Sequence, residues 1–61
     1  MNSAFLTAQE VAEILRVSGS YAYKVITSLN QELEQNGYRT VKGKVNRAYF
    51  EERYFYKSQT V

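Results

Sequence analysis

The side chains of this sequence that could do chemistry are mainly cations able to pair with phosphate groups. The chain holds eight Lys and Arg residues against six acids, and its formal net charge is +2. No acid lies in the segment 38–49, which carries half of the basic residues: Arg39, Lys42, Lys44 and Arg47. Basic residues concentrated in this way neutralise phosphates. A solvated basic loop is the other interpretation of the segment.

Catalysis is not expected from this composition. The sequence has no histidine, cysteine or aspartate and no glycine-rich phosphate loop, so the usual pairs of nucleophile and base cannot be assembled. Glu51 and Glu52 are adjacent and would diverge by about 100° on a helix, which argues against an acid–base pair. Zinc would find only carboxylate ligands. We therefore predict a protein that is not an enzyme and that has no metal site and no cofactor.

The length and composition predict one small domain, residues 1–61. The lack of cysteine is compatible with a reducing cytosol. The N-terminus lacks the basic-then-apolar pattern of a signal peptide. No apolar run approaches the roughly 20 residues that span a bilayer. We expect a cytoplasmic protein that does not associate with membranes.

The segment from Leu6 to Tyr23 is predicted to form two short helices joined by a turn, and the other elements of the chain are expected to pack around them. Thr7 and Glu10 have the spacing of a capping box and predict a helix over 8–15. Ser18 is a second helix cap that follows after a short connection. Two helices joined by such a turn form a helix-turn-helix unit. The first helix should pack through its apolar residues, which are Val11, Ala12, Ile14 and Leu15.

A second, longer helix is predicted from Gly19 to Gln35 or Asn36, where Asn36-Gly37 supplies a left-handed end. Its apolar stripe should be buried and consists of Ala22, Val25, Ile26, Leu29 and Leu33. The opposite, polar side consists of Ser20, Lys24, Thr27 and Gln31, with Tyr21 and Tyr23 on its flanks. No acid occurs in this helix before Glu32, which suits an approach to phosphate at the helix N-terminus.

The remaining chain predicts a hairpin and a third helix. Residues 38–41 read as a strand, Lys42-Gly43-Lys44 as a turn and Val45 as the start of a second strand. Asn46 can cap a helix from Arg47 to about Tyr56. The three consecutive aromatics Tyr54, Phe55 and Tyr56 exceed what one helix face can hide, so this end either wraps over the first two helices or is partly exposed for a partner. Residues 1–5 and 57–61 read as a loose leader and a frayed tail, although Phe5 and Leu6 could instead fold back as the hydrophobic staple of the first helix.

The segment Phe5 to Ser18, FLTAQEVAEILRVS, resembles the opening of excisionase-like and MerR-like winged-helix DNA-binding proteins, whose members often read L-T-x-x-E-V-A-x-x-L-x-V-S. The hairpin and the stretch YFEERY, Tyr49–Tyr54, resemble small proteins of this type from phages and integrative elements of Gram-positive bacteria. The resemblance covers roughly Phe5 to Tyr56. The fold class expected is α+β and mainly helical: a winged helix-turn-helix with three helices and one two-stranded β-hairpin.

The resemblance also implies which residues meet DNA. The second helix would lie in the major groove through Ser18, Ser20, Tyr21, Lys24 and Thr27. The hairpin, or wing, would meet the backbone or minor groove through Arg39, Lys42, Lys44 and Arg47. Tyr21 and Tyr23 could instead pack in the core; of the two, Tyr23 lies nearer the polar side and is the better candidate for a hydrogen bond to phosphate. Ser18 serves first as a cap.

The function that the resemblance favours is that of an excisionase, an accessory factor that steers a site-specific recombinase of a mobile element without doing the strand chemistry. A transcriptional regulator with the same fold is the first alternative. The second is a protein-interaction module that docks through its aromatic C-terminal helix. The expected partners are double-stranded DNA, a recombinase, and further copies of the chain as a homodimer or a cooperative array.

Overall fold

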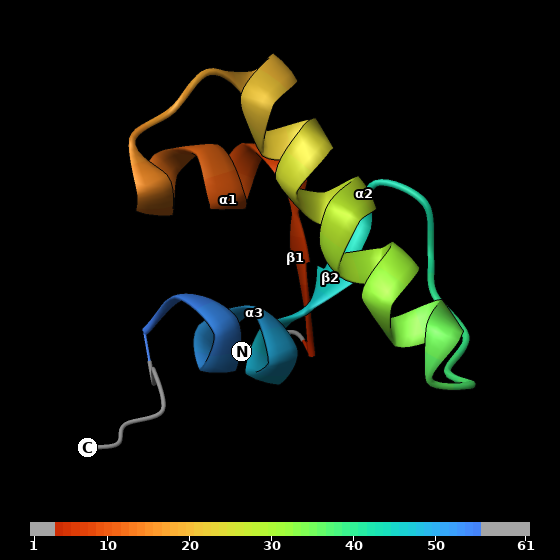
Figure 1. The fold of residues 1–61 in the computed structure, drawn as a ribbon. Helices are drawn as coiled ribbons and strands as arrows, with labels where there is room; N and C mark the ends of the chain where they lie inside the picture. Colours follow the sequence, from red (N-terminus) through yellow and green to blue (C-terminus); the bar gives the residue numbers. More distant parts are fainter. Residues whose placement is uncertain (1–3, 56–61) are drawn as a thin grey trace.

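The computed structural model describes residues 4–55. The elements along the chain are β1 (Phe5–Thr7), α1 (Ala8–Leu15), α2 (Gly19–Gln35), β2 (Lys44–Asn46) and α3 (Arg47–Tyr54) (Figure 1). Most of the predicted leader, Tyr56 and the predicted tail lie outside the described residues. The structure is therefore mainly helical, with three helices and one two-stranded antiparallel sheet.

Each predicted helix begins at its predicted cap. The Thr7 hydroxyl accepts a hydrogen bond from the Glu10 amide at 3.2 Å, and the Glu10 carboxylate accepts one from the Thr7 amide at 2.9 Å. The side chains of Ser18 and Asn46 each accept a hydrogen bond from the amide three residues later, at 3.1 and 2.8 Å. These bonds satisfy amides that have no partner within the helix. The third helix ends at Tyr54, short of the predicted end at about Tyr56.

The predicted hairpin is wrong in its strand pairing. β2 pairs antiparallel with β1, so that Val45 lies opposite Leu6, and residues 38–40 form no strand. Within the predicted wing a single bridge joins Val41 to Lys44. The pairing sets Leu6 opposite Val45, and both side chains are buried in the core. Phe5 consequently belongs to the sheet and not to a loose leader.

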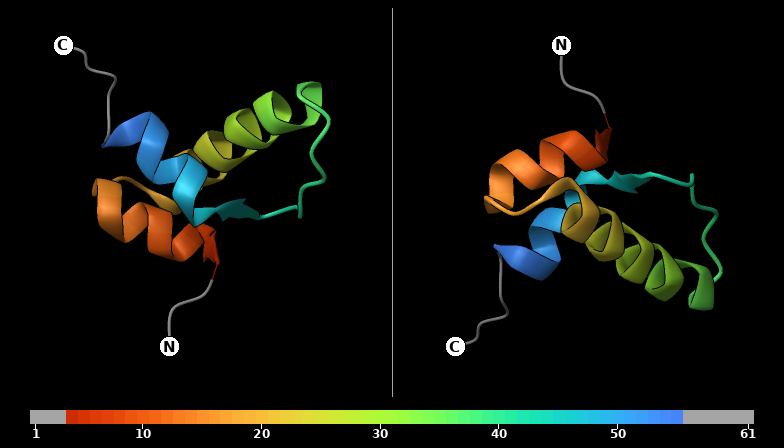
Figure 2. Two further views of the ribbon diagram at one scale, coloured as in Figure 1. Left: turned by 90° about the horizontal axis from the view of Figure 1, so that it is seen from below. Right: turned by 90° about the horizontal axis from the view of Figure 1, so that it is seen from above.

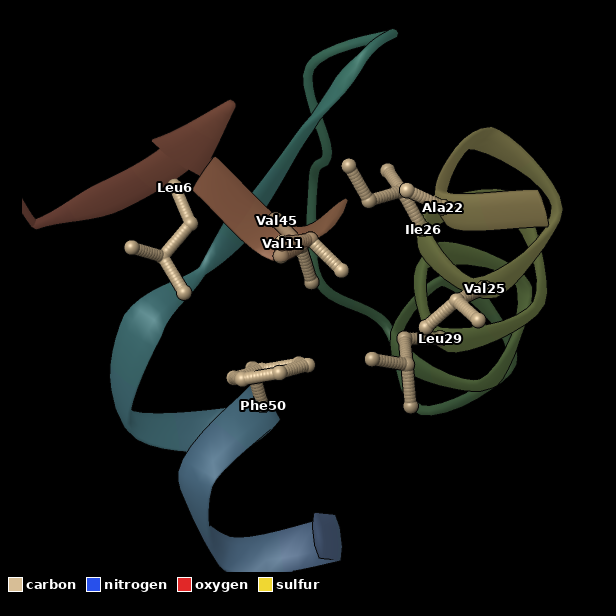
Figure 3. Close-up of a cluster of buried hydrophobic side chains, with 8 residues drawn as sticks. All are labelled: Leu6, Val11, Ala22, Val25, Ile26, Leu29, Val45 and Phe50. Atoms are coloured by element: carbon tan, nitrogen blue, oxygen red, sulfur yellow. The ribbon is translucent and has the colours of Figure 1, made fainter. Parts of the chain in front are cut away.

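The core gathers between the sheet and the three helices. Phe50 of α3 is fully buried and faces the other buried side chains, which come from both strands, α1 and α2 (Figure 3). The buried apolar residues are Leu6, Val11, Ala22, Val25, Ile26, Leu29, Val45 and Phe50. Two predicted core positions differ, because Ile14 is 42% exposed at the edge of α1 and Leu33 is only half-buried near the end of α2.

Polar contacts join α2 to α3 beside this core. The Tyr49 hydroxyl donates to a Glu32 carboxylate oxygen at 2.5 Å, and the Arg53 guanidinium forms an ion pair with the same carboxylate at 3.2 Å. The hydrogen bond to Glu32, with burial and the charge of the carboxylate, raises the pKa of Tyr49. The phenol therefore stays protonated, and able to donate to Glu32, to a higher pH than an ordinary tyrosine.

The C-terminal half of α2 and the segment that follows it extend away from the rest of the molecule. Figure 2 shows this part from two sides, with α1 and α3 at the opposite end. One long helix and the loop beside it thus form a projection that other molecules can approach.

The described residues include no helix long and apolar enough to cross a membrane.

Candidate nucleic-acid interface

The outer face of α2 is the first part of this projection. We give that name to its exposed polar side, which consists of Ser20, Tyr23, Lys24, Thr27 and Gln31. The apolar stripe of the same helix faces the core, so helical periodicity leaves these residues directed outward. The first turn carries no acid. The face is therefore polar and cationic at its N-terminal half.

The second part is the segment that we call the basic loop, residues 38–44, which contains Arg39, Lys42 and Lys44. It lies against the outer face of α2. A Cβ atom added to Gly43 would be 3.3 Å from the Tyr23 hydroxyl oxygen, so the loop backbone passes directly beside that ring. Gly43 has a φ of +80°, which an L-residue adopts only with strain. A side chain at this position is thus opposed by the backbone conformation, and it would also require the Tyr23 hydroxyl to move slightly.

Two shallow grooves follow the outer face of α2 and meet along it. One is lined by Tyr23, Lys24, Thr27, Ser28 and Gln31. The other runs between α2 and the basic loop and is lined by Thr27, Asn30, Gln31, Glu34, Thr40, Lys42 and Gly43. Because Thr27 and Gln31 belong to both, the two grooves form one continuous surface. Lysines from the helix and from the loop lie along it.

Some of the predicted residues meet on this surface and others do not. Tyr23, Lys24, Thr27 and Lys42 line it. Ser18 caps α2, and Ser20 is exposed beside the cap. Tyr21 is exposed but lines neither groove. Lys44 is exposed on β2.

Arg39 and Arg47 take different positions. Arg39 lines a separate cleft of about 650 Å³ on the α3 side of the basic loop, together with Phe5, Leu33 and Tyr38. Arg47 is half-buried in the first turn of α3, where its guanidinium lies 3.9 Å from the Glu51 carboxylate. The structure does not place either arginine in the grooves along α2.

A carboxylate interrupts the cationic surface at its far end. Glu34 lines the groove beside Lys42, and the Thr40 hydroxyl donates a hydrogen bond to it. Because like charges repel, Glu34 disfavours phosphate at this end. The most cationic part of the surface therefore runs from the N-terminal half of α2 to Lys42.

Nearly the whole chain aligns with an excisionase of an integrative element. The alignment spans 57 residues at 44% identity, covers 93% of this chain and 89% of the relative, and matches the ICEBs1 excisionase of Bacillus subtilis (strain 168). The chain belongs to the family of this excisionase. The resemblance of FLTAQEVAEILRVS to excisionase-like proteins is thereby confirmed. No protein-family model matches the sequence, and no solved structure matches the fold.

The excisionase-family chain carries residues on this surface that the sequence patterns did not single out as site residues. Gln31 was recognised as outward-facing, but its place in both grooves depends on the position of the basic loop. Ser28 and Asn30 lie where the polar side of α2 meets its apolar stripe. Asn30 is buried, so its amide lies among the core-facing residues of the helix. A polar residue at the edge of an apolar stripe was the available signal for Asn30.

The same surface offers no arrangement suited to a metal ion. Within residues 4–55 no three carboxylates gather closely enough to bind one. The donors along the grooves are lysines, hydroxyls and amides, which suit phosphate oxygens and base edges. The chemistry available here is recognition of an anionic polymer.

Proposed function

We propose that this chain is an excisionase: a DNA-binding factor of a mobile element that steers a site-specific recombinase and does not itself break or join strands. The observation that carries the proposal is the 44% identity to the ICEBs1 excisionase over nearly the whole of both chains. The continuous groove along α2, with its lysines and hydroxyls, supports DNA as the ligand. The binding mode below belongs to the same proposal.

In this mode the fold acts as a winged helix-turn-helix on double-stranded DNA. The outer face of α2 enters the major groove, which is wide enough for an α-helix. Lys24 and Thr27 reach base edges, and Tyr23 donates to a phosphate beside the basic loop. The basic loop takes the place of the wing on the backbone or minor groove. The full set of proposed contacts is Ser18, Ser20, Tyr21, Tyr23, Lys24, Thr27, Arg39, Lys42, Lys44 and Arg47.

One copy of so small a module makes few phosphate contacts. Its affinity for DNA should therefore be weak and should fall steeply with salt. Several copies on adjacent sites, or a homodimer, would raise the overall affinity without any new contact to DNA. Repeated binding sites on an attachment region are the expected arrangement.

Fluorescence anisotropy of a labelled duplex tests the DNA-binding part of the proposal. The protein should bind at low salt and release the duplex as salt rises. The triple variant Lys24→Glu, Lys42→Glu, Lys44→Glu should lose binding, because three of the proposed phosphate-binding cations, from α2 and the basic loop, become anions. Arg53→Gln is the control, since that arginine pairs with Glu32. Retained affinity in the folded triple variant would contradict the proposed surface.

A recombination assay separates the excisionase from its alternatives. Supplied with the recombinase of the same element and a substrate with its attachment sites, the protein should promote excision. A transcriptional regulator would instead change expression from a nearby promoter with no effect on excision.

Protein docking through the aromatic end is a second candidate function. Tyr54 stacks on Phe50 and Phe55 meets the same ring edge to face, yet both remain about half-exposed, so the two neighbouring aromatic side chains offer apolar surface to a partner. Tyr54→Ser with Phe55→Ser should then impair excision while leaving affinity for DNA unchanged.

A further inference from the structure

Asn30 is the one residue of α2 that is both polar and buried in the described part of the chain. Its side-chain nitrogen Nδ2 donates two hydrogen bonds to the basic loop. One reaches the carbonyl oxygen of Lys44 at 2.9 Å, and the other reaches that of Val41 at 3.2 Å. The two acceptors flank the turn that carries Lys42 and Gly43. Both hydrogens of the amide are thus used to hold the two ends of this turn to α2.

The loop depends on such a contact because it has little regular structure of its own. Residues 38–40 form no strand, and the turn is closed by one backbone hydrogen bond, from the Lys44 amide to the Val41 carbonyl at 3.1 Å. A β-ladder would normally fix a wing, whereas here the ladder pairs β2 with β1. The further side-chain tie to α2, between Thr40 and Glu34, is exposed to water, where a hydrogen bond stabilises less.

The position of Asn30 also sets where the lysines of the loop lie. It lines the groove that contains Lys42 and the cleft that contains Arg39, so it sits under the loop between the two. The Tyr23 ring supports Gly43 from the side of the outer face. Asn30 and Tyr23 therefore hold the turn at two points from one rigid helix.

From this geometry we infer that Asn30 is a positioning residue for DNA binding. It fixes Lys42 and Lys44 relative to the outer face of α2. When α2 lies in the major groove, both lysines can then meet phosphates of the same duplex. The inference rests on the proposed DNA-binding function. Asn30 itself touches no DNA in this arrangement. Its role is to replace, with one amide, the strand pairing that this wing lacks.

The test is a double-mutant comparison of salt dependence in anisotropy titrations of an arbitrary duplex. In the wild-type protein, Lys42→Ala with Lys44→Ala should lower the slope of log affinity against log salt by about two, one for each phosphate that is no longer neutralised. Leucine has a side chain of similar size to asparagine but no hydrogen-bond donor. In the Asn30→Leu protein, the same two lysine changes should lower the slope by less than about one. Asn36→Ala is the matched control, since its amide bonds only to its own helix, at the Glu32 carbonyl.

The outcomes separate the two ideas. A full drop of about two in the Asn30→Leu background would overturn the positioning role. No change on removing the lysines from the wild-type protein would overturn the proposed wing contact itself, and with it the consequence of Asn30 for DNA. A merely structural role would lower the melting temperature of Asn30→Leu and leave the effect of the lysines intact.

A measurement on the unaltered protein guards against a variant that does not fold. The side-chain amide protons of Asn30 should exchange slowly with solvent in NMR spectra, because both are bonded and the residue is buried. Those of Asn36, which is exposed, should exchange fast. Equal, fast exchange at both residues would overturn the inference. Asn30→Asp provides a second variant, in which an oxygen without a proton faces two carbonyl oxygens and should free the loop.

Discussion

At the scale of single residues, Arg16 holds an unusual backbone conformation between α1 and α2. Its φ and ψ are 60° and 48°, in the left-handed region. The amide of this residue bonds to the Ala12 carbonyl and ends α1, as glycine commonly does at such positions. An L-residue in this region costs roughly 1–2 kcal/mol. The turn between α1 and α2 therefore carries strain that its sequence did not reveal.

Replacing Arg16 by glycine should stabilise the protein. The relief of strain exceeds the added flexibility of glycine in the unfolded chain, roughly 0.5–1 kcal/mol, so the net gain should be about 0.5–1 kcal/mol. The melting temperature followed by circular dichroism should rise by roughly 2–8 °C. Arg16→Lys keeps the same strained conformation and should melt like the wild-type protein. An equal rise in both variants would show that the side-chain head group, and not the backbone, is responsible.

Phe50 dominates the core of this small chain. Its ring is fully buried and stacks with Tyr54 at 5.1 Å between centroids. Phe50→Ala should cost about 3–5 kcal/mol, which is comparable to the whole stability expected of so small a domain. The variant should be largely unfolded at 25 °C by circular dichroism. Phe55→Ala, at a half-exposed position, should lose at most about 1 kcal/mol and remain folded. A cooperative melt of Phe50→Ala near that of the wild type would contradict this account.

At the scale of elements, the helices could be predicted from sequence and the sheet could not. Thr7, Ser18 and Asn46 indicate helix starts through contacts only three residues long, so local patterns suffice. The partner of β2 is a strand almost 40 residues earlier in the chain. The alternation in residues 38–45 predicts a local hairpin. A local pattern carries no information about pairing with a distant strand, so it could not indicate β1 as the partner. The decisive factor is the burial of Leu6 against Val45.

Gly43 links two of these elements, because it allows the basic loop to pass beside Tyr23. Gly43→Ala should destabilise the protein by about 1 kcal/mol through its positive φ. It should also weaken DNA binding, since the Tyr23 hydroxyl, the proposed donor to phosphate, would have to move aside for the new methyl group. Thermal melting and anisotropy titration measure the two effects.

Gly37→Ala supplies the matched control for that change. Gly37 has a φ of +90°, but a Cβ there would meet nothing within 4 Å. It should therefore show the same loss of stability with unchanged affinity for DNA. If both variants lost affinity equally, strain at the ends of the loop would explain the effect, and the contact between Gly43 and Tyr23 would not.

At the scale of the whole molecule, the candidate surface depends on how distant segments meet. The sequence predicted Lys24 and Thr27 from helical period, and Lys42 from local charge, and the structure brings these three together. It could not predict that Arg39 would turn to the other side of the loop, because that depends on the path of residues 38–41. For the same reason the sequence could not predict that Glu34 would line the groove between α2 and the basic loop.

The negative charge of Glu34 should weaken the attraction between the whole molecule and DNA, and this effect can be measured. Glu34→Gln removes one negative charge from the groove. It retains a side-chain oxygen that can accept the hydrogen bond from the Thr40 hydroxyl. A unit charge about 8 Å from a phosphate in a watery groove is worth roughly 0.5 kcal/mol, and salt screens it further. Affinity for an arbitrary duplex at low salt should therefore rise roughly twofold. Anisotropy titration of the two proteins side by side resolves such a difference.

The control for Glu34 lies on another element. Glu13→Gln removes the same charge from the exposed surface of α1, away from the grooves that line α2. A gain at Glu34 that is absent at Glu13 would locate the duplex in the groove between α2 and the basic loop. Equal gains at both sites would mean that only net charge matters, and that DNA approaches the chain without a preferred face. The comparison thus tests the proposed orientation independently of any lysine.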